Sequence, residues 1–220
     1  MEHFIRRIIL MFSCFGVFVL LSLKTKDEEK TIIKAETIKI ELKKEKSNLV
    51  INYLEKEIQS EINNYIKRIA PNSKVKGEVL WEISKKYKID IILILAQASL
   101  ESHFGTTGKA KHTKSVFNVG TWDDGQIKNT YNDVNESIEP YAKLLSEHYL
   151  IDEKTNIDSL LTNNNFKNKF GYRFASNKHY EKNLKRIIRK IKRDFDIDEY
   201  LQIYDKLNNL NNELNKQREI

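Results

Sequence analysis

The sequence is poor in the residues that crosslink chains and shape tight turns, with 1 Cys, 2 Pro and 7 Gly in 220 residues. A single cysteine excludes an internal disulfide. So little Gly and Pro argues against an architecture of many strands and turns, and it predicts long helices. Four of the glycines (Gly105, Gly108, Gly120 and Gly125) fall in one short stretch. Unusual backbone geometry is therefore expected there.

Hydropathy and charge limit the classes of protein without choosing one. Hydrophobic residues make up 40% of the chain and charged residues 31%, and the mean hydropathy is −0.57. These values allow one packed core and exclude a polytopic membrane protein. The net charge of +7 suits nucleic acid, an anionic membrane or an anionic wall polymer. Lys, Asn and Ile are abundant throughout, so the charge can also be a matter of general composition.

The one long apolar run lies at the N-terminus. Residues 8–23 carry no charge, follow Arg6 and Arg7, and precede Lys24. About twenty residues are needed to span a bilayer, and Phe4 and the residue after it can extend the run. A cleaved signal peptide begins in the same way, but no small-x-small cleavage site follows. We expect residues 1–23 to be a single-pass anchor in the cell membrane. The rest of the chain would lie on the extracytoplasmic side, or be secreted if the segment is cleaved.

The remaining chain divides into three parts. Residues 24–47 are charged and are expected to form a partly helical stalk. Residues 48–196 form the expected domain, which opens with an amphipathic helix that ends before Pro71. Residues 197–220 carry an apolar stripe on a polar helix. This C-terminal helix can dock on the domain or mediate self-association, and its pattern does not distinguish the two.

The most informative segment begins with an apolar stretch at residues 89–104. Its length, the N-cap residue Asp90 and the following Gly105 predict a buried helix rather than a strand. Glu101 lies one turn after Gln97, near the helix end. A carboxyl group against apolar walls has a raised pKa, so it can stay protonated and donate its proton. The alternative is that Glu101 caps the helix end or pairs with a lysine.

A resemblance to a known family gives this segment a function. Ala96-Gln97, then Glu101 to Gly105 in a Glu-Ser-x-x-Gly pattern, then Val116 to Gly120, resemble the glucosaminidase family (glycoside hydrolase family 73). The resemblance covers about residues 62–191. It implies a mainly α, lysozyme-like α+β domain with a small β-hairpin. It also implies hydrolysis of bonds in peptidoglycan, with Glu101 as the proton donor.

The resemblance leaves the second catalytic residue open. Many members of the family carry a second acid in a longer hairpin, whereas residues 120–132 here hold only Asp123 and Asp124. An inverting enzyme needs its base about 6.5–9.5 Å from the acid, and a nucleophile would lie near 5 Å. One aspartate can be that base, or both can form a turn with Gly125. In the second case the acetamido group of the substrate assists, or an anhydro sugar forms.

A tyrosine near the end of the domain is the other catalytic candidate. Members of the family carry a tyrosine that faces the cleft at this point, which implies that role for Tyr180. The alternative is that Tyr180 is the first core residue of its helix, for which Ser176 is the expected N-cap.

Further residues are expected to contact sugar, because aromatic rings stack on sugar faces and hydroxyl groups need polar partners. Arg173 can pair with an acidic stem-peptide group or with a structural carboxylate. The five histidines form no metal motif, so no metal and no cofactor are expected. The expected substrate contacts are Gln97, Phe117, Asn118, Trp122, Tyr172 and Arg173. Phe117, Asn118, Trp122 and Tyr172 can instead be part of the core.

Together these features predict a peptidoglycan hydrolase that cuts β-1,4 glycosidic bonds in the manner of an endo-β-N-acetylglucosaminidase. Its partners would be glycan strands and, through the anchor, the membrane. Two alternatives are a lytic transglycosylase on the same fold and a catalytically silent wall-binding or scaffold protein. A nucleic-acid partner is not expected for an exported chain.

Overall fold

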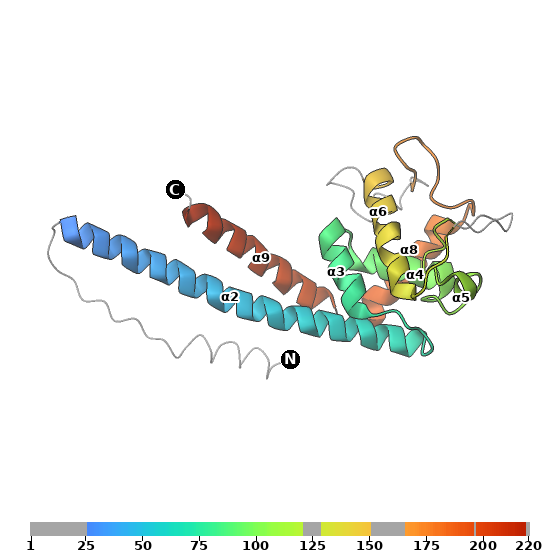
Figure 1. Cartoon of the computed structure of the whole chain (residues 1–220), viewed down its shortest axis with the longest axis horizontal. Coiled ribbons are helices and arrows are strands. Elements are labelled where there is room, and N and C mark those ends of the chain that lie inside the picture. Colours follow the sequence, from blue (N-terminus) through green and yellow to red (C-terminus); the bar gives the residue numbers. More distant parts are fainter. Residues whose placement is uncertain (1–25, 121–128, 151–165, 196, 219–220) are drawn as a thin grey trace.

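The computed structural model describes residues 26–120, 129–150, 166–195 and 197–218 (Figure 1). These residues are mainly helical, which confirms the mainly α part of the predicted fold. The elements are α2 (Lys26–Ile69), α3 (Gly77–Tyr87), α4 (Ile91–Ser102), α5 (Ala110–Thr113), the 3-10 helix η1 (Val134–Ser137), α6 (Ile138–His148), α8 (Tyr180–Asp194) and α9 (Asp198–Arg218).

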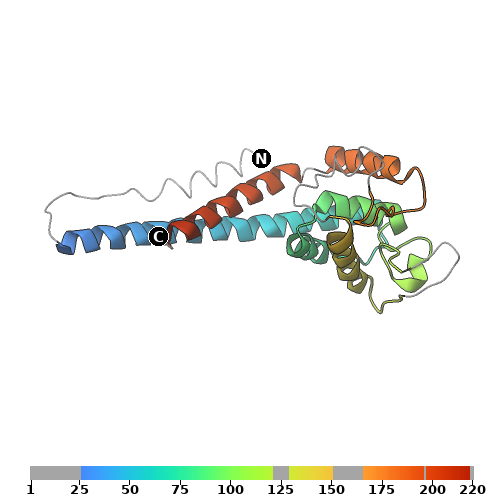
Figure 2. The ribbon, with the colours of Figure 1, turned by 90° about the horizontal axis from the view of Figure 1, so that it is seen from above.

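A long helical pair extends from one side of the domain (Figures 1 and 2). The 44 residues of α2 would span about 66 Å at 1.5 Å per residue. Its predicted apolar stripe is buried, and the helix ends just before Ala70 and Pro71. The last helix, α9, packs antiparallel along α2. Three hydrogen bonds fix this register: Tyr204 to Glu55 at 3.0 Å, Asn211 to Asn48 at 2.8 Å and Lys44 to Asn215 at 2.7 Å.

This pairing bears on two of the expected segments. The expected stalk, from residue 26 onward, and the first helix of the expected domain are one continuous helix, so the stalk has no joint at residue 47. The stripe of the C-terminal helix is used within the chain, where Leu214 is buried in the pair with α2. Self-association through this helix stays a prediction.

The core of the domain surrounds α4. Every residue from Ile91 to Ala98 is buried, as the uniformly apolar sequence predicts. Helix α8 packs on α4, α3 contacts α2, α4 and α6, and the aromatic rings of Phe104 and Phe195 pack against Tyr65 of α2. Because α4 is buried on all sides, its axis is held in place. This determines where its C-terminal residues reach the surface of the core.

No β-strand occurs in the described ranges, so the expected hairpin is not seen there; residues 121–128 of that segment lie outside them. One isolated antiparallel bridge joins Lys167 to Arg173. Within the described part of the chain, no helix combines the length and apolar character needed to cross a membrane. The expected anchor, residues 1–23, lies outside the described residues.

Candidate active site

Glu101 lies at the C-terminal end of α4, at the surface of the core. The side chain of Asp90 caps the other end by accepting a hydrogen bond from the Ile92 amide at 2.7 Å, as predicted. After Ser102 the chain turns sharply, because His103, Phe104 and Gly105 all have positive φ angles. This turn stops the helix one residue after Glu101. The carboxylate therefore lies on the last turn of a buried helix, where the core meets solvent.

Two neighbouring polar side chains hold this helix end in place. The hydroxyl of Ser102 donates to the carbonyl oxygen of Val116 at 2.6 Å and accepts from the Gly105 amide at 2.7 Å. The side-chain amide of Asn118 donates to the carbonyl oxygen of Glu101 at 2.8 Å. The Glu-Ser pair of the sequence pattern is thereby explained. Its serine ties the helix end to the segment that carries Asn118.

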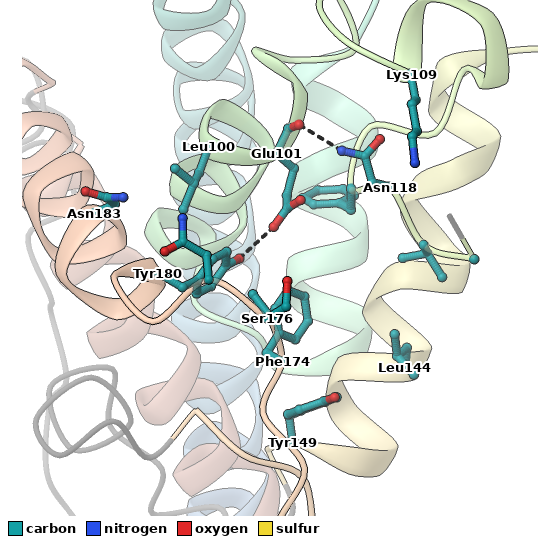
Figure 3. Close-up of a pocket in the computed structure, with 15 residues that line it drawn as sticks. Leu100, Glu101, Lys109, Asn118, Leu144, Tyr149, Phe174, Ser176, Tyr180 and Asn183 are labelled. Atoms are coloured by element: carbon teal, nitrogen blue, oxygen red, sulfur yellow. Dashed lines mark hydrogen bonds between the residues drawn. The ribbon is translucent and has the colours of Figure 1, made fainter. Parts of the chain in front are cut away.

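Glu101 lines a pocket of about 680 Å³ that opens beside the helix end (Figure 3). Residues from three stretches of the chain, 100–120, 144–149 and 174–183, form its wall. They are Leu100, Glu101, Lys109, Phe117, Asn118, Val119, Gly120, Leu144, Tyr149, Phe174, Ala175, Ser176, Asn177, Tyr180 and Asn183. A carboxyl group at an opening of this size is accessible to a ligand while its helix stays buried.

The carboxyl group of Glu101 has an environment suited to acid chemistry. The hydroxyl of Tyr180 donates a hydrogen bond to Oε1 of Glu101 at 2.9 Å (Figure 3). Burial raises the pKa of Glu101, whereas the hydrogen bonds from Tyr180 and Asn118 lower it, and burial prevails. The group is thus protonated at a higher pH than an exposed glutamic acid, as the apolar sequence around it predicted.

Behind Tyr180 lies a buried polar chain. The side-chain amide of Gln97 donates to the Tyr180 hydroxyl at 3.0 Å, and the Tyr141 hydroxyl donates to Oε1 of Gln97. Burial raises the pKa of both tyrosine hydroxyls well above the usual range, so both are neutral donors. Gln97 is fully buried. In this structure it contacts the two tyrosines rather than the pocket where a sugar contact was expected.

The other predicted residues fall into three groups. Phe117 and Asn118 line the pocket with Glu101 and Tyr180. Phe117 is also stacked on Tyr141, with ring centroids 3.5 Å apart, so it forms part of the core beneath the pocket. Trp122, Asp123 and Asp124 lie outside the described residues.

Arg173 and Tyr172 are placed away from the pocket wall. The guanidinium of Arg173 pairs with the buried carboxylate of Glu181 at 2.6 Å, which is the structural alternative left open by the sequence. The side chain of Tyr172 is 70% exposed and is not part of the pocket lining. Ser176 is not the N-cap of α8, because that helix begins at Tyr180 with His179 as its cap residue. Ser176 lines the pocket instead.

Several lining residues were not expected from the sequence as site residues. Tyr149 is the half-buried residue that directly follows α6, and Phe174 follows the bridge at Arg173. Their rings meet edge to face, with centroids 5.2 Å apart, and form an aromatic wall. Lys109, Asn177 and Asn183 add polar groups. Phe174 could have been suspected because it follows Tyr172 and Arg173, which were expected to contact substrate. Nothing in the sequence around Tyr149 distinguishes a pocket residue from a core residue.

Gly120 is the last described residue of the pocket wall before Asp123 and Asp124 in the sequence. It has a φ of 76°, and a Cβ there would approach the side chain of Asn129 to 2.6 Å. Because an extended residue spans at most about 3.6 Å, three or four residues can cover about 11–14 Å. This length is the upper limit on the distance from Gly120 to Asp123 or Asp124. Among the described lining residues, Glu101 is the sole carboxylate.

The arrangement combines one carboxyl group with a pKa raised by burial, an aromatic wall and several amide and hydroxyl groups around an open pocket. Aromatic rings stack on the apolar faces of sugars, and polar side chains satisfy their hydroxyl groups. The chemistry available is proton donation to a bound polar substrate.

Comparison with known protein families gives one match. The family described as Glucosaminidase, mannosyl-glycoprotein endo-beta-N-acetylglucosaminidase, matches residues 77–193, which is just over half of the chain. The matched range includes α3 to α6 and nearly all of α8, and every described residue of the pocket wall lies within it. A search of curated proteins finds no match.

Proposed function

The chain belongs to the mannosyl-glycoprotein endo-beta-N-acetylglucosaminidase family and is a glycoside hydrolase, and on this premise we propose that it cuts β-1,4 bonds of peptidoglycan glycan strands with Glu101 as general acid. The observation that carries the proposal is the position of the Glu101 carboxyl. It is partly buried at the end of α4, bonded to Tyr180, and exposed to a pocket large enough for a sugar.

The proposed reaction begins with proton transfer. Protonated Glu101 gives its hydrogen to the glycosidic oxygen as the bond from that oxygen to the anomeric carbon breaks. The aglycone leaves with a new hydroxyl group, and the sugar ring carries positive charge. Water then adds to the anomeric carbon and loses a proton to a base. The Tyr180 hydroxyl stabilises the Glu101 carboxylate that this step leaves behind.

The base that receives the proton from water is proposed to be Asp123 or Asp124. Support comes from the position of Gly120, which lines the pocket a few residues before them. An inverting reaction would need that carboxylate about 6.5–9.5 Å from Glu101.

A second candidate is the non-hydrolytic reaction of a lytic transglycosylase. It is favoured by one observation, which is that the described pocket wall offers a single carboxylate. In this reaction the 6-hydroxyl group of the muramic acid, in place of water, attacks the anomeric carbon. It needs no separate base to activate water.

Product analysis separates these reactions. The full chain is incubated with purified peptidoglycan, and the new ends are identified by mass spectrometry before and after borohydride reduction. Reducible N-acetylglucosamine ends support the proposed function. Reducible N-acetylmuramic acid ends would mean that the other β-1,4 bond is cut, and anhydromuramic ends would establish the transglycosylase.

Replacing Tyr180 with Phe tests the environment of the acid. The substitution removes the hydrogen bond that stabilises ionised Glu101, so the pKa of Glu101 rises further. Because the acid works only when protonated, activity falls as pH rises through its pKa. The alkaline limb of the kcat profile should therefore move to higher pH, with kcat lower by about three- to ten-fold for one hydrogen bond. An unchanged limb would contradict the contact between Tyr180 and Glu101.

Lys109 is the one cation among the described residues of the pocket wall, and peptidoglycan carries carboxylates on its stem peptides. We expect Lys109→Gln to raise KM for peptidoglycan by up to about five-fold, the value of one exposed ion pair, without changing kcat. The difference should vanish at high salt and be absent with an uncharged chitin oligosaccharide. Lys111→Gln is the matched control, because Lys111 is exposed and outside this pocket. Equal effects on charged and uncharged substrates would disprove the ionic role.

The location of the enzyme follows as a proposal from the same chain. The basic-flanked apolar run at residues 8–23 supports an anchor with the domain on the extracytoplasmic side. Helix α2 supports a spacer function, because its N-terminal end lies far along the helix from the domain (Figure 1). A cysteine-accessibility experiment on intact cells, with cysteines introduced at exposed positions of α9, tests which side the domain occupies.

A further inference from the structure

A chain of three buried side chains connects the core to Glu101. The Tyr141 hydroxyl donates to Oε1 of Gln97, Nε2 of Gln97 donates to the Tyr180 hydroxyl at 3.0 Å, and that hydroxyl donates to Oε1 of Glu101 at 2.9 Å. The exposed fractions are 0% for Tyr141, 0% for Gln97 and 5% for Tyr180. Three helices supply its members, because Gln97 and Glu101 lie on α4, Tyr141 on α6 and Tyr180 on α8.

We infer that Tyr141 and Gln97 are positioning residues for the proposed reaction, and that they direct the Tyr180 hydrogen to Oε1 of Glu101 so that the transferable proton resides on Oε2. Neither residue lines the pocket, so neither is assigned a contact with substrate. The inference rests on the proposed role of Glu101 as general acid.

The orientation of the Gln97 amide follows from the needs of its neighbours. The hydroxyl hydrogen of Tyr141 is buried, and Oε1 of Gln97 accepts it. If the amide were reversed, its NH₂ group would face Tyr141 and the hydroxyl hydrogen would lose this acceptor. A buried donor without an acceptor is strongly disfavoured, because it has lost its hydrogen bond to water. Tyr141 therefore holds the amide with its NH₂ group towards Tyr180.

This orientation sets the direction of the bond to the acid. Because Nε2 of Gln97 already donates to the Tyr180 oxygen, the Tyr180 hydrogen points to Glu101. Oε1 of Glu101 accepts that hydrogen in both protonation states, and the proton of the neutral acid is carried by Oε2. The reversed chain, in which Glu101 donates to Tyr180, would direct the reactive proton into the core. The hydrogen bonds of such a network depend on one another, so the effects of substituting two of its residues are not additive.

The groups that can influence Glu101 are few in the described part of the site. Tyr180 faces it from α8, Asn118 bonds it from the segment after α5, Tyr141 acts from α6 through Gln97, and Lys109 lines the pocket beside α5. Tyr141→Phe keeps the ring that stacks on Phe117 and removes only the hydroxyl, which is linked by hydrogen bonds to Glu101 through Gln97 and Tyr180. This separates an effect on the acid from a general effect on packing.

A double-mutant cycle on the full chain tests the inference, with Tyr141→Phe, Tyr180→Phe and the double variant assayed on peptidoglycan across pH. We expect Tyr141→Phe to lower kcat by about three- to ten-fold, the worth of one hydrogen bond, at unchanged KM. Its alkaline limb should move to higher pH, because Tyr180 then donates to Glu101 in only part of the molecules. The double variant should match Tyr180→Phe alone, because Tyr141 then has no hydroxyl to direct.

Tyr65→Phe is the matched control, since Tyr65 is a buried tyrosine of α2 outside this chain of hydrogen bonds. It should leave kcat and the pH profile unchanged. Multiplicative losses in the double variant, or a lower melting temperature in Tyr141→Phe with normal kcat and pH profile, would overturn the inference. Should Tyr141→Phe not fold, Gln97→Met breaks the same chain and should be equally non-additive with Tyr180→Phe. Full activity in Glu101→Gln would instead overturn the proposed function itself.

Discussion

Replacing Glu101 with Gln is expected to lower kcat/KM on peptidoglycan by about 10²- to 10⁴-fold, which is the usual contribution of a general acid. The amide has nearly the same shape, so it can still accept the hydrogen bond from Tyr180. It has no proton to give to the leaving oxygen. Rates are measured as reducing ends released from purified peptidoglycan over a range of pH.

The pH profile gives a second readout for this substitution. The parent enzyme should lose activity as pH rises through the raised pKa of Glu101, because the acid is then ionised. That limb should be absent from the residual activity of Glu101→Gln. Glu199→Gln on α9 is the control, since Glu199 is exposed and outside the pocket. A Glu101→Gln enzyme that retained more than about a tenth of the parent rate would remove Glu101 from the role of acid.

Replacing Arg173 with Met is expected to destabilise the domain by about 3 kcal/mol, the lower end of the range for breaking a buried ion pair. The carboxylate of Glu181 is only 4% exposed, and Arg173 pairs with it at 2.6 Å. The same guanidinium donates to the carbonyl oxygen of Asn177 at 3.2 Å. Removing Arg173 leaves a buried negative charge beside Tyr180. The free energy of unfolding is measured by urea denaturation.

Two further variants test whether the unpaired carboxylate of Glu181 causes this destabilisation. Glu181→Gln should cost less, because Arg173 is 28% exposed and water can solvate it. The double variant Arg173→Met/Glu181→Leu should recover much of the loss, since no buried charge then remains. If Arg173 were instead a contact for stem peptides, Arg173→Met would raise KM at unchanged stability. That result would restore the alternative left open by the sequence.

The helix that carries the acid could be predicted because its signals are local. Asp90 caps it, the residues from Ile91 to Ala96 are uniformly apolar, and the turn after Ser102 is marked by Gly105. A helix of this composition has to be buried, so a carboxylate on its last turn has to lie at the edge of the core. The periodicity of α2 and its end before Pro71 were predictable for the same reason.

Other expectations failed or stayed open because they depend on contacts between distant segments. Ser176 was expected to be the N-cap of the helix that contains Tyr180. The helix begins only at Tyr180, and Ser176 lines the pocket. Gln97 was expected to contact sugar, but the position of Tyr141 in α6 makes it a buried link. Helical spacing alone cannot separate a pocket-lining face from a core face, since both are apolar.

The sequence by itself determined that the chain is mainly helical, that Glu101 lies at the end of a buried helix, and that apolar surroundings raise the pKa of its carboxyl group. These properties arise from neighbours within a few residues, through capping, periodicity and desolvation. Only the tertiary structure decided which side chains meet that carboxyl group. Tyr180 lies 79 residues away from Glu101 in sequence and bonds it directly, while Tyr149 and Phe174 come from separate segments. Such contacts depend on how the helices pack around α4, which no local pattern encodes.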